Sequence, residues 1–360
     1  MTVEQAVRPE IRRPEFHELR IASIAPLTTD AVAITFVVPD DLTSAYTFTA
    51  GQHLTLRSDL AGDDVRRSYS ICSAEGGPLR IGVKRLPGGA FSEKALGVLG
   101  VGDTLEVMTP MGRFGSALRA AEHQSLGFVA AGSGVTPVLS LVQTALETTD
   151  VQVSLVCANR TAGSVMFLDE IADLKDRFPA RLHVVHVLSR EPQESELLSG
   201  RLDRERMQRV LRALVEPRQD AWFLCGPFDL VTAAHEALVL EGVDAGAIHS
   251  ELFHAESLHR PGPVQTAPGG TQVTARLDGR ESSFTVDGRA SVLDSLLVVR
   301  GDAPYACKGG VCGTCRAKVL EGEVVMDSNW ALEPGEIERG YVLTCQSHPT
   351  TQTLRLDYDG

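Results

Sequence analysis

Four cysteines near the end of the chain are spaced so that they could hold a metal centre. They are Cys307, Cys312, Cys315 and Cys345 among seven cysteines in all. Four residues separate the first two, two residues separate the next two, and the last follows after 29 more. This is the spacing of the thiolate ligands of a plant-type 2Fe-2S cluster. Glycines between the ligands would let the backbone turn tightly and aim amide N–H groups at sulfur.

Two other interpretations of these cysteines are a pair of disulfides and a zinc site. Residues 1–13 are charged and lack the apolar stretch of a signal peptide, so we expect a cytoplasmic protein, in which disulfides are rare. Zinc sites usually pair one C-x2-C with a second or with closely spaced histidines, and neither follows here. The spacing therefore favours the iron–sulfur cluster.

A glycine-rich turn in the middle of the chain predicts a phosphate site. The sequence AGSGVTP follows an apolar stretch and opens a helix, so Gly132 and Gly134 would let a phosphate approach the backbone while Thr136 caps the helix. It is not the GxGxxG dinucleotide fingerprint. Cys225 and Gly226 end a later strand, at the edge where open α/β sheets bind ligands. The alternative for Cys225 is a small buried thiol beside a turn.

Cations at two further strand ends bear on the kind of dinucleotide. Arg160 follows one expected strand, and Ser189 and Arg190 follow the next. A 2′-phosphate needs such cations, whereas a free 2′-OH favours a carboxylate. The pattern favours NADPH. Solvated surface arginines are the alternative, and Glu191 weakens the signal.

The sequence RSYS in the first third of the chain has the side chains that a flat, phosphorylated cofactor needs. Arg67 could neutralise a pyrophosphate, Tyr69 could lie against a ring, and Ser70 could donate a hydrogen bond to a ring nitrogen. An ordinary exposed strand explains the same four residues equally well.

The sequence VKRLPGGAFS follows soon afterwards and is a glycine-rich turn leading into a helix. Val83 and Lys84 begin it, and Gly89 and Ser92 lie at the expected helix start. Backbone N–H groups there could meet a diphosphate, although many proteins contain such a turn for purely structural reasons.

Three domains and a linker would position these motifs. Residues 14–118 contain short alternating runs broken by Gly, Pro and Asp, which predicts an antiparallel β-barrel. Residues 119–254 alternate apolar strands with helices, which predicts a parallel α/β sheet. The proline-containing residues 255–270 indicate a linker. Residues 271–360 contain a hairpin turn, a short helix and the cysteine loop, which we assign to an α+β domain. In the second domain the expected strands are 125–131, 151–157, 182–188, 221–224 and 248–253, and the expected helices are 137–147, 169–178, 204–214 and 229–240.

The balance of charge argues against nucleic acid as a partner. The 360 residues include 34 Lys+Arg and 47 Asp+Glu, a formal net charge of −13, without a local basic block. Residues 126–146 carry no charge over a length that could cross a bilayer, but glycines and a proline divide them into a strand, a turn and a helix start. We expect neither nucleic acid nor a membrane as a partner.

Together, these motifs resemble the ferredoxin-NADP reductase superfamily joined to a C-terminal plant-type ferredoxin domain of β-grasp fold. The resemblance covers nearly the whole chain. Residues 305–316 (YACKGGVCGTCR) and 340–346 (GYVLTCQ) are most similar to reductase subunits of phenylacetyl-CoA epoxidase complexes. Steroid 9α-hydroxylase reductases share the layout.

The resemblance implies specific roles for the motif residues. Arg67 would bind the FAD diphosphate, Tyr69 the isoalloxazine and Ser70 the flavin N5 edge. Val83, Lys84, Gly89 and Ser92 match the second flavin motif. Gly132, Gly134 and Thr136 match the NADPH segment, Cys225 and Gly226 match the segment over the nicotinamide, and Glu251 would face the flavin. Of these, Ser70, Cys225 and Glu251 would form the catalytic site.

The implied activity is an electron relay from NADPH through FAD and the 2Fe-2S cluster to a separate diiron oxygenase. Phenylacetyl-CoA epoxidase in phenylacetate degradation is the expected oxygenase, with a steroid 9α-hydroxylase or an aromatic-ring oxygenase as alternatives. The flavin is needed because a hydride carries two electrons and the cluster accepts one. A non-catalytic redox sensor or electron-transfer adaptor is the alternative of another class.

Overall fold

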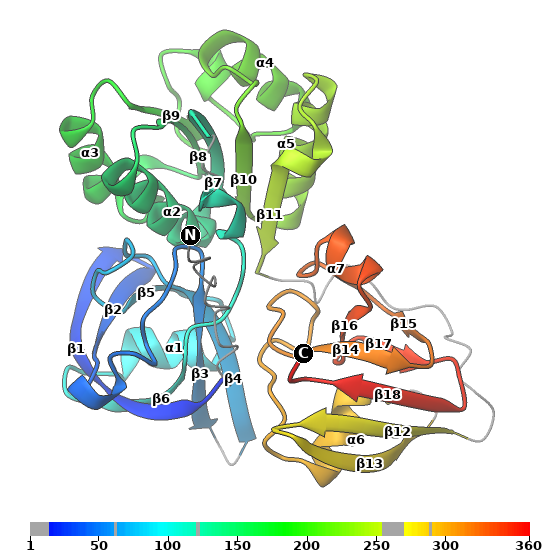
Figure 1. The fold of residues 1–360 in the computed structure, drawn as a ribbon. Coiled ribbons are helices and arrows are strands. Elements are labelled where there is room, and N and C mark those ends of the chain that lie inside the picture. Colours follow the sequence, from blue (N-terminus) through cyan, green and yellow to red (C-terminus); the bar gives the residue numbers. More distant parts are fainter. Residues whose placement is uncertain (1–13, 61–62, 120–122, 254–269, 288–289) are drawn as a thin grey trace, which may run out of the picture.

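The computed structural model describes residues 14–60, 63–119, 123–253, 270–287 and 290–360. Most of the predicted linker therefore lies outside the described residues. The rest is organised around three main sheets (Figure 1), which we call the barrel, the parallel-sheet part and the C-terminal part.

The barrel is a six-stranded antiparallel sheet in the order β4-β3-β6-β1-β2-β5. Buried side chains from its strands form one apolar core, and a bridge between Ile71 and Ile81 links the ends of β4 and β5, so the sheet curves back on itself. The prediction of an antiparallel barrel is confirmed. The elements are β1 (Phe16–Thr28), β2 (Ala31–Val37), β3 (His53–Leu60), β4 (Asp63–Ser70), β5 (Arg80–Lys84), α1 (Ala90–Gly97) and β6 (Thr104–Met108).

The parallel-sheet part has five strands in the order β11-β10-β7-β8-β9, all parallel. The apolar runs that predicted strands do form them, and both faces of the sheet are covered by helices, as their continuous burial requires. The strands are β7 (Ser125–Ala131), β8 (Gln152–Asn159), β9 (Leu182–Leu188), β10 (Ala221–Gly226) and β11 (Ile248–Leu252); the helices are α2 (Val135–Thr148), α3 (Leu168–Arg177), α4 (Arg204–Leu214) and α5 (Phe228–Leu240).

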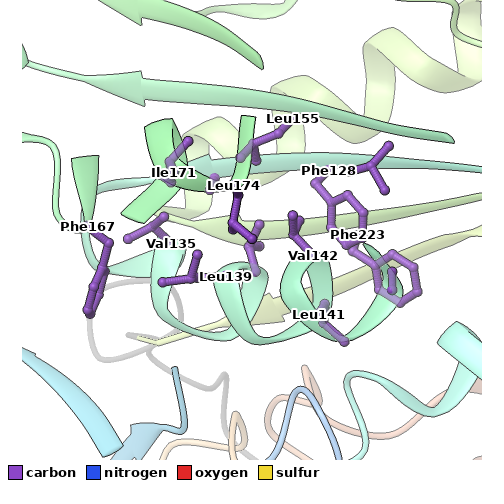
Figure 2. Close-up of a cluster of buried hydrophobic side chains, with 14 of the residues drawn as sticks. Phe128, Val135, Leu139, Leu141, Val142, Leu155, Phe167, Ile171, Leu174 and Phe223 are labelled. Carbon is purple, nitrogen blue, oxygen red and sulfur yellow. The ribbon is translucent and has the colours of Figure 1, made fainter. Parts of the chain in front are cut away.

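One apolar cluster joins the barrel to the parallel-sheet part. Side chains of α2, α3 and the sheet fill the space between helix and strand (Figure 2), and Ala31, Ala33 and Cys72 of the barrel belong to the same buried cluster as Leu139 and Leu141 of α2. The buried Ser140 hydroxyl donates a hydrogen bond to the carbonyl of Ser73, 2.6 Å away. The barrel and the parallel-sheet part therefore share a core.

The C-terminal part is a mixed five-stranded sheet in the order β13-β12-β18-β14-β16, with a helix packed against it. The predicted hairpin turn is present at Asp278 and Gly279, both with positive φ (56° and 67°), and Ser291 caps the predicted helix by accepting a hydrogen bond from Asp294 N. The elements are β12 (Thr271–Leu277), β13 (Arg280–Val286), α6 (Val292–Val299), β14 (Arg316–Glu321), β15 (Val324–Met326), α7 (Pro334–Glu338), β16 (Tyr341–Leu343), β17 (Ser347–Pro349) and β18 (Thr353–Asp357).

Short 3-10 turns link these elements. They are Asp40–Leu42, Ser116–Arg119, Gly132–Gly134, Ala162–Ser164, Glu196–Leu198 and Ala245–Ala247. Among the described residues, no helix combines the length and the apolar character that crossing a bilayer would need.

Candidate functional site

The three predicted catalytic residues meet where the barrel joins the parallel-sheet part. Cys225 on β10 lies directly opposite Glu251 on the neighbouring strand β11, and Ser70 at the end of β4 approaches the Glu251 carboxyl from the barrel. Cys225 and Ser70 are buried, and Glu251 is half-buried with an Oε2 that solvent does not reach. Residues up to 181 positions apart in sequence are thus gathered at one sheet edge.

The site is uncharged near neutral pH. Burial raises the pKa of Glu251 to about 8, against a smaller lowering by hydrogen bonding from Ser70. Burial, and secondarily the Glu251 charge, holds the pKa of Cys225 well above its usual range. Neither side chain is therefore mainly ionised at pH 7, and a thiolate nucleophile at Cys225 is excluded.

The glycine-rich turn lies directly against the end of β10. A Cβ on Gly134 would stand 2.3 Å from the Cys225 carbonyl oxygen and 2.7 Å from Gly226 N, so only glycine fits there. Gly132 has φ +55° with no atom within 4 Å of the position that its Cβ would take, and so leaves open space at the turn. The backbone is shaped for close approach of a phosphate.

The prediction that Thr136 caps α2 is wrong. The helix begins at Val135, two residues before the predicted start at Pro137, so Thr136 lies inside its first turn. The Thr136 hydroxyl donates to the Ser133 carbonyl at 2.9 Å. No described side chain caps α2. The Val135 N–H, the first of the helix, already donates to the Gly132 and Ser133 carbonyls of the preceding 3-10 turn.

The two arginines predicted to bind a 2′-phosphate are neighbours at the carboxyl edge of the sheet. Arg190 N donates a hydrogen bond to the Arg160 carbonyl at 2.8 Å, and Ser189 lies beside them, with all three side chains exposed. Glu191, which weakened the signal in the sequence, uses Oε2 to accept a hydrogen bond from Ala162 N at 2.9 Å. The positive charge of the arginine pair faces solvent.

The residues of the RSYS motif alternate along β4. Arg67 is exposed and its guanidinium donates to the Arg66 carbonyl at 2.8 Å, while the half-buried Tyr69 ring lies 5.3 Å from that of Phe91. Burial raises the pKa of Tyr69, so the phenol stays neutral. Ser70 points to the opposite face, as the period of a strand requires.

Hydrogen bonds within the second motif, VKRLPGGAFS, stabilise its turn. The buried Ser92 hydroxyl accepts a hydrogen bond from Leu86 N at 3.0 Å, and a Cβ on Gly89 would stand 2.6 Å from that hydroxyl oxygen. The Val83 side chain lies in the barrel core, and the Lys84 ammonium pairs with Asp30 at 3.3 Å. These four residues shape the turn. Their side chains are engaged within the protein or absent, so the backbone of the turn is the part that could contact a ligand.

His53 is a candidate that the sequence did not reveal. It lies directly opposite Ser70 in the β3–β4 pairing, is buried, and has an Nε2 without a hydrogen-bond partner in the described residues. Burial lowers its pKa to about 4, so the imidazole is neutral. His53 Nε2 and Glu251 Oε2 are both buried without a hydrogen-bond partner in the described residues. A bound ring with hydrogen-bonding atoms could partner them.

The four C-terminal cysteines form two pairs. Hydrogen bonding links the Cys307 and Cys312 side chains, and likewise those of Cys315 and Cys345. Gly309 N donates to Cys307 Sγ at 3.3 Å, as expected for amides aimed at sulfur. Lys308, Gly310 and Gly313 between these cysteines all have positive φ.

The same pairing bears on the alternatives considered for these cysteines. None of the seven, all of which the structure describes, forms a disulfide. Two pairs of thiols instead suit a cluster of two irons with four cysteine ligands.

The loop of residues 307–315, which we call the cysteine loop, lies between the other two parts. Val311 belongs to the apolar cluster that covers one face of the parallel sheet, and Cys307 packs against the same cluster. Tyr305, two residues before Cys307, lies under Arg66 of β4, with the guanidinium carbon 3.9 Å from the ring centroid. A cluster held here is adjacent to the strand that carries the RSYS motif.

Comparisons with known proteins agree with these three parts. Family models match residues 18–115 as an oxidoreductase FAD-binding domain, 128–236 as an oxidoreductase NAD-binding domain and 275–350 as a 2Fe-2S iron–sulfur cluster binding domain. The solved structure of phthalate dioxygenase reductase has the same fold, with a TM-score of 0.60 and 24% identity over 95% of this chain and 98% of its own.

Two curated relatives cover almost the whole chain. One of the subunits of 1,2-phenylacetyl-CoA epoxidase from Escherichia coli (strain K12) is 42% identical over 96% of this chain and 98% of its own. The ferredoxin reductase component of 3-ketosteroid-9-alpha-monooxygenase from Rhodococcus rhodochrous is 34% identical over 94% of this chain and 96% of its own. The chain is therefore an oxidoreductase with FAD-binding, NAD-binding and 2Fe-2S domains, and it belongs to the ferredoxin reductase family that includes these oxygenase reductase components.

Proposed function

We propose that this protein is the NADPH-dependent reductase of a phenylacetyl-CoA epoxidase and delivers electrons from NADPH through FAD and a 2Fe-2S cluster to the oxygenase component. One observation carries the electron route: the cysteine loop lies against both the RSYS strand and the parallel sheet. The choice of partner is supported by the 42% identity to the E. coli epoxidase protein over nearly the full chain. When bound, the flavin converts the two-electron hydride of NADPH into the single electrons that the cluster carries.

Ser70, Cys225 and Glu251 would form the hydride-transfer site by placing the nicotinamide against the flavin. A neutral thiol and a protonated carboxyl exclude water without adding a charge. Ser70 supplies a hydroxyl at the flavin edge. No acid or base is needed for hydride transfer, so the task of these residues is to hold the reacting atoms at about 3–3.5 Å.

The remaining motif residues would hold the two nucleotides. Gly132, Gly134 and Thr136 would lie along the pyrophosphate of NADPH and Gly226 over its nicotinamide, while Arg160, Ser189 and Arg190 would meet its 2′-phosphate. Arg67 neutralises the FAD diphosphate and Tyr69 packs on the flavin ring. The backbone of the turn shaped by Val83, Lys84, Gly89 and Ser92 provides amide donors to FAD, because their side chains are committed elsewhere or absent.

Cys307, Cys312, Cys315 and Cys345 would ligate the cluster, one pair to each iron. This assignment rests on the two thiol pairs and on the amide directed at Cys307 Sγ. A cytoplasmic location, where cysteines stay reduced, goes with this assignment. We place the domain boundaries at 14–118, 119–254 and 271–360, with 255–270 as the linker; the family matches fall inside these limits.

Reconstitution with two oxygenases tests the choice of partner. The purified holoprotein is mixed with the other components of E. coli phenylacetyl-CoA epoxidase, and NADPH oxidation is followed with and without phenylacetyl-CoA. The proposal predicts oxidation that depends on phenylacetyl-CoA. Turnover only with the oxygenase component of a 3-ketosteroid 9α-monooxygenase and its steroid would assign the second partner instead. Turnover with neither, despite active reduction of ferricyanide, would contradict both.

A further inference from the structure

Glu336 in the C-terminal part is a buried carboxylate that faces cations from two parts of the molecule. Its side chain is 5% exposed, and its Oε1 lies 2.7 Å from Nη1 of Arg113 in the barrel and 3.5 Å from Nη1 of Arg316. Its Oε2 accepts a hydrogen bond from Glu333 N at 3.2 Å. Both oxygens are therefore engaged by protein atoms.

The position of Glu336 follows from local structure around the cysteine loop. Glu333 and Glu336 form a capping box at the start of α7, which fixes the Glu336 rotamer toward the barrel. Arg316 immediately follows Cys315. One carboxylate thus connects the barrel to the residue next to a cluster ligand.

The segment that carries Glu336 also contacts the parallel-sheet part. Glu333 Oε1 lies 3.6 Å from Nδ1 of His249 on β11, and the Trp330 ring lies 5.3 Å from that of Phe228 at the start of α5. Figure 1 shows α7 near the end of β11. Residues 328–339, which we call the junction segment, therefore touch both neighbouring parts.

We propose that Glu336 is the positioning residue that fixes the cysteine loop against the barrel through its ion pair with Arg113. This inference rests on the proposed function, because the step it serves is the transfer of one electron from reduced flavin to oxidised cluster, in which no bond forms or breaks. Glu336 contacts neither group and acts through docking. Removal of Arg113 leaves Arg316 as a partner for the buried carboxylate, so the C-terminal part keeps its fold while docking weakens.

Stopped-flow reduction of the holoprotein by NADPH separates the two electron-transfer steps. In Arg113→Gln, flavin bleaching should keep its wild-type rate, whereas cluster bleaching should become about tenfold slower, which corresponds to about 1.4 kcal/mol in the docked population. Arg113→Lys should restore most of the rate. The matched control is Arg201→Gln, which removes an exposed ion pair to Asp229 (2.7 Å) within the parallel-sheet part and should change neither step.

Small-angle X-ray scattering of the oxidised holoprotein gives a readout that is independent of activity. As salt is raised, the ion pair is screened and the molecule should expand. Arg113→Gln and Glu336→Gln should expand at lower salt than wild type or the Arg201→Gln control. The inference would be overturned if Arg113→Gln expanded at the same salt concentration as wild type and its cluster bleached at a rate within twofold of wild type. Absence of flavin-to-cluster transfer in the wild type would instead refute the relay, and scattering would still decide the docking role.

Discussion

The two interfaces of the molecule are built from different chemistry. Between the barrel and the parallel-sheet part, buried alanines and leucines form one continuous core, and a Cβ on Gly82 of β5 would stand 2.6 Å from the Thr136 methyl group. Between the C-terminal part and its neighbours, ion pairs and aromatic contacts lie beside the apolar packing of Val311, and a cavity of about 320 Å³ is lined by Arg66 and Met108 from one side and Pro304 from the other.

The difference matches what has to cross each interface. A hydride moves only between atoms in contact, so its donor and acceptor must be held rigidly, and a shared apolar core does this. A single electron tolerates a looser contact. The interface of the C-terminal part is partly polar and is moreover of the kind that can separate, as delivery to another protein would require.

The largest effect should come from removing the cluster while leaving the apolar interface intact. Cys312→Ser should abolish electron delivery to the oxygenase and the visible absorption of the cluster, because one of four ligands is lost. NADPH-dependent reduction of ferricyanide should continue at a rate close to wild type. Loss of both activities would show that the two interfaces do not work separately.

The glycine-rich turn near the apolar interface should be displaced by a single methyl group on Gly134. Gly134→Ala places a Cβ against the Cys225 carbonyl, and relief of that overlap must displace the turn or β10. We expect flavin reduction by NADPH to fall by about a hundredfold. Gly163→Ala, in the same part but with no atom within 4 Å of the new Cβ, is the matched control and should leave the rate unchanged. Equal rates in both variants would count against a phosphate site at this turn.

The arginine pair should affect nucleotide choice alone. Arg160→Gln should raise the KM for NADPH about tenfold, because a charge-assisted contact to the 2′-phosphate is lost, and should leave the KM for NADH unchanged. Steady-state ferricyanide reduction measures both constants. A parallel rise for both nucleotides would remove these arginines from the 2′-phosphate site.

The smallest effect should be on stability, through Glu251. Its pKa is raised from 4.5 to about 8, so the folded protein keeps a proton that the unfolded chain releases above about pH 4.5. Stability therefore falls as the pH rises from about 4.5 to 8, and Glu251→Gln removes this loss. Between pH 5 and pH 8 the thermal midpoint of the variant should rise relative to wild type by several degrees. A difference in thermal midpoint that does not change between pH 5 and pH 8 would show that the Glu251 carboxyl is solvated and that its pKa is not raised.

Sequence alone was sufficient where neighbours in the chain make the structure. The cysteine spacing, the hairpin at Asp278 and Gly279, and the apolar strands of the parallel sheet depend on residues close in sequence, and the structure confirms the hairpin and the strands. The start of α2 was missed by two residues because Pro137 fits the first turn without being its first residue.

The features that sequence reasoning missed depend on distant contacts. In the sequence, His53 is one polar residue in a run that predicts a strand. Only the pairing of His53 with Ser70 in the sheet shows that it lies beside the candidate site. Glu336 and Arg113 are 223 residues apart, and each belongs to an unremarkable charged stretch. Their pairing follows from how the parts dock, which no local pattern encodes.

Anaerobic stopped-flow mixing of the holoprotein with NADPH, followed at flavin and cluster wavelengths, tests the electron route most directly. The relay predicts that flavin absorbance falls first and cluster absorbance follows without any partner protein, and that NADH acts much more slowly. Flavin bleaching with a cluster that stays oxidised would contradict the route through the cysteine loop.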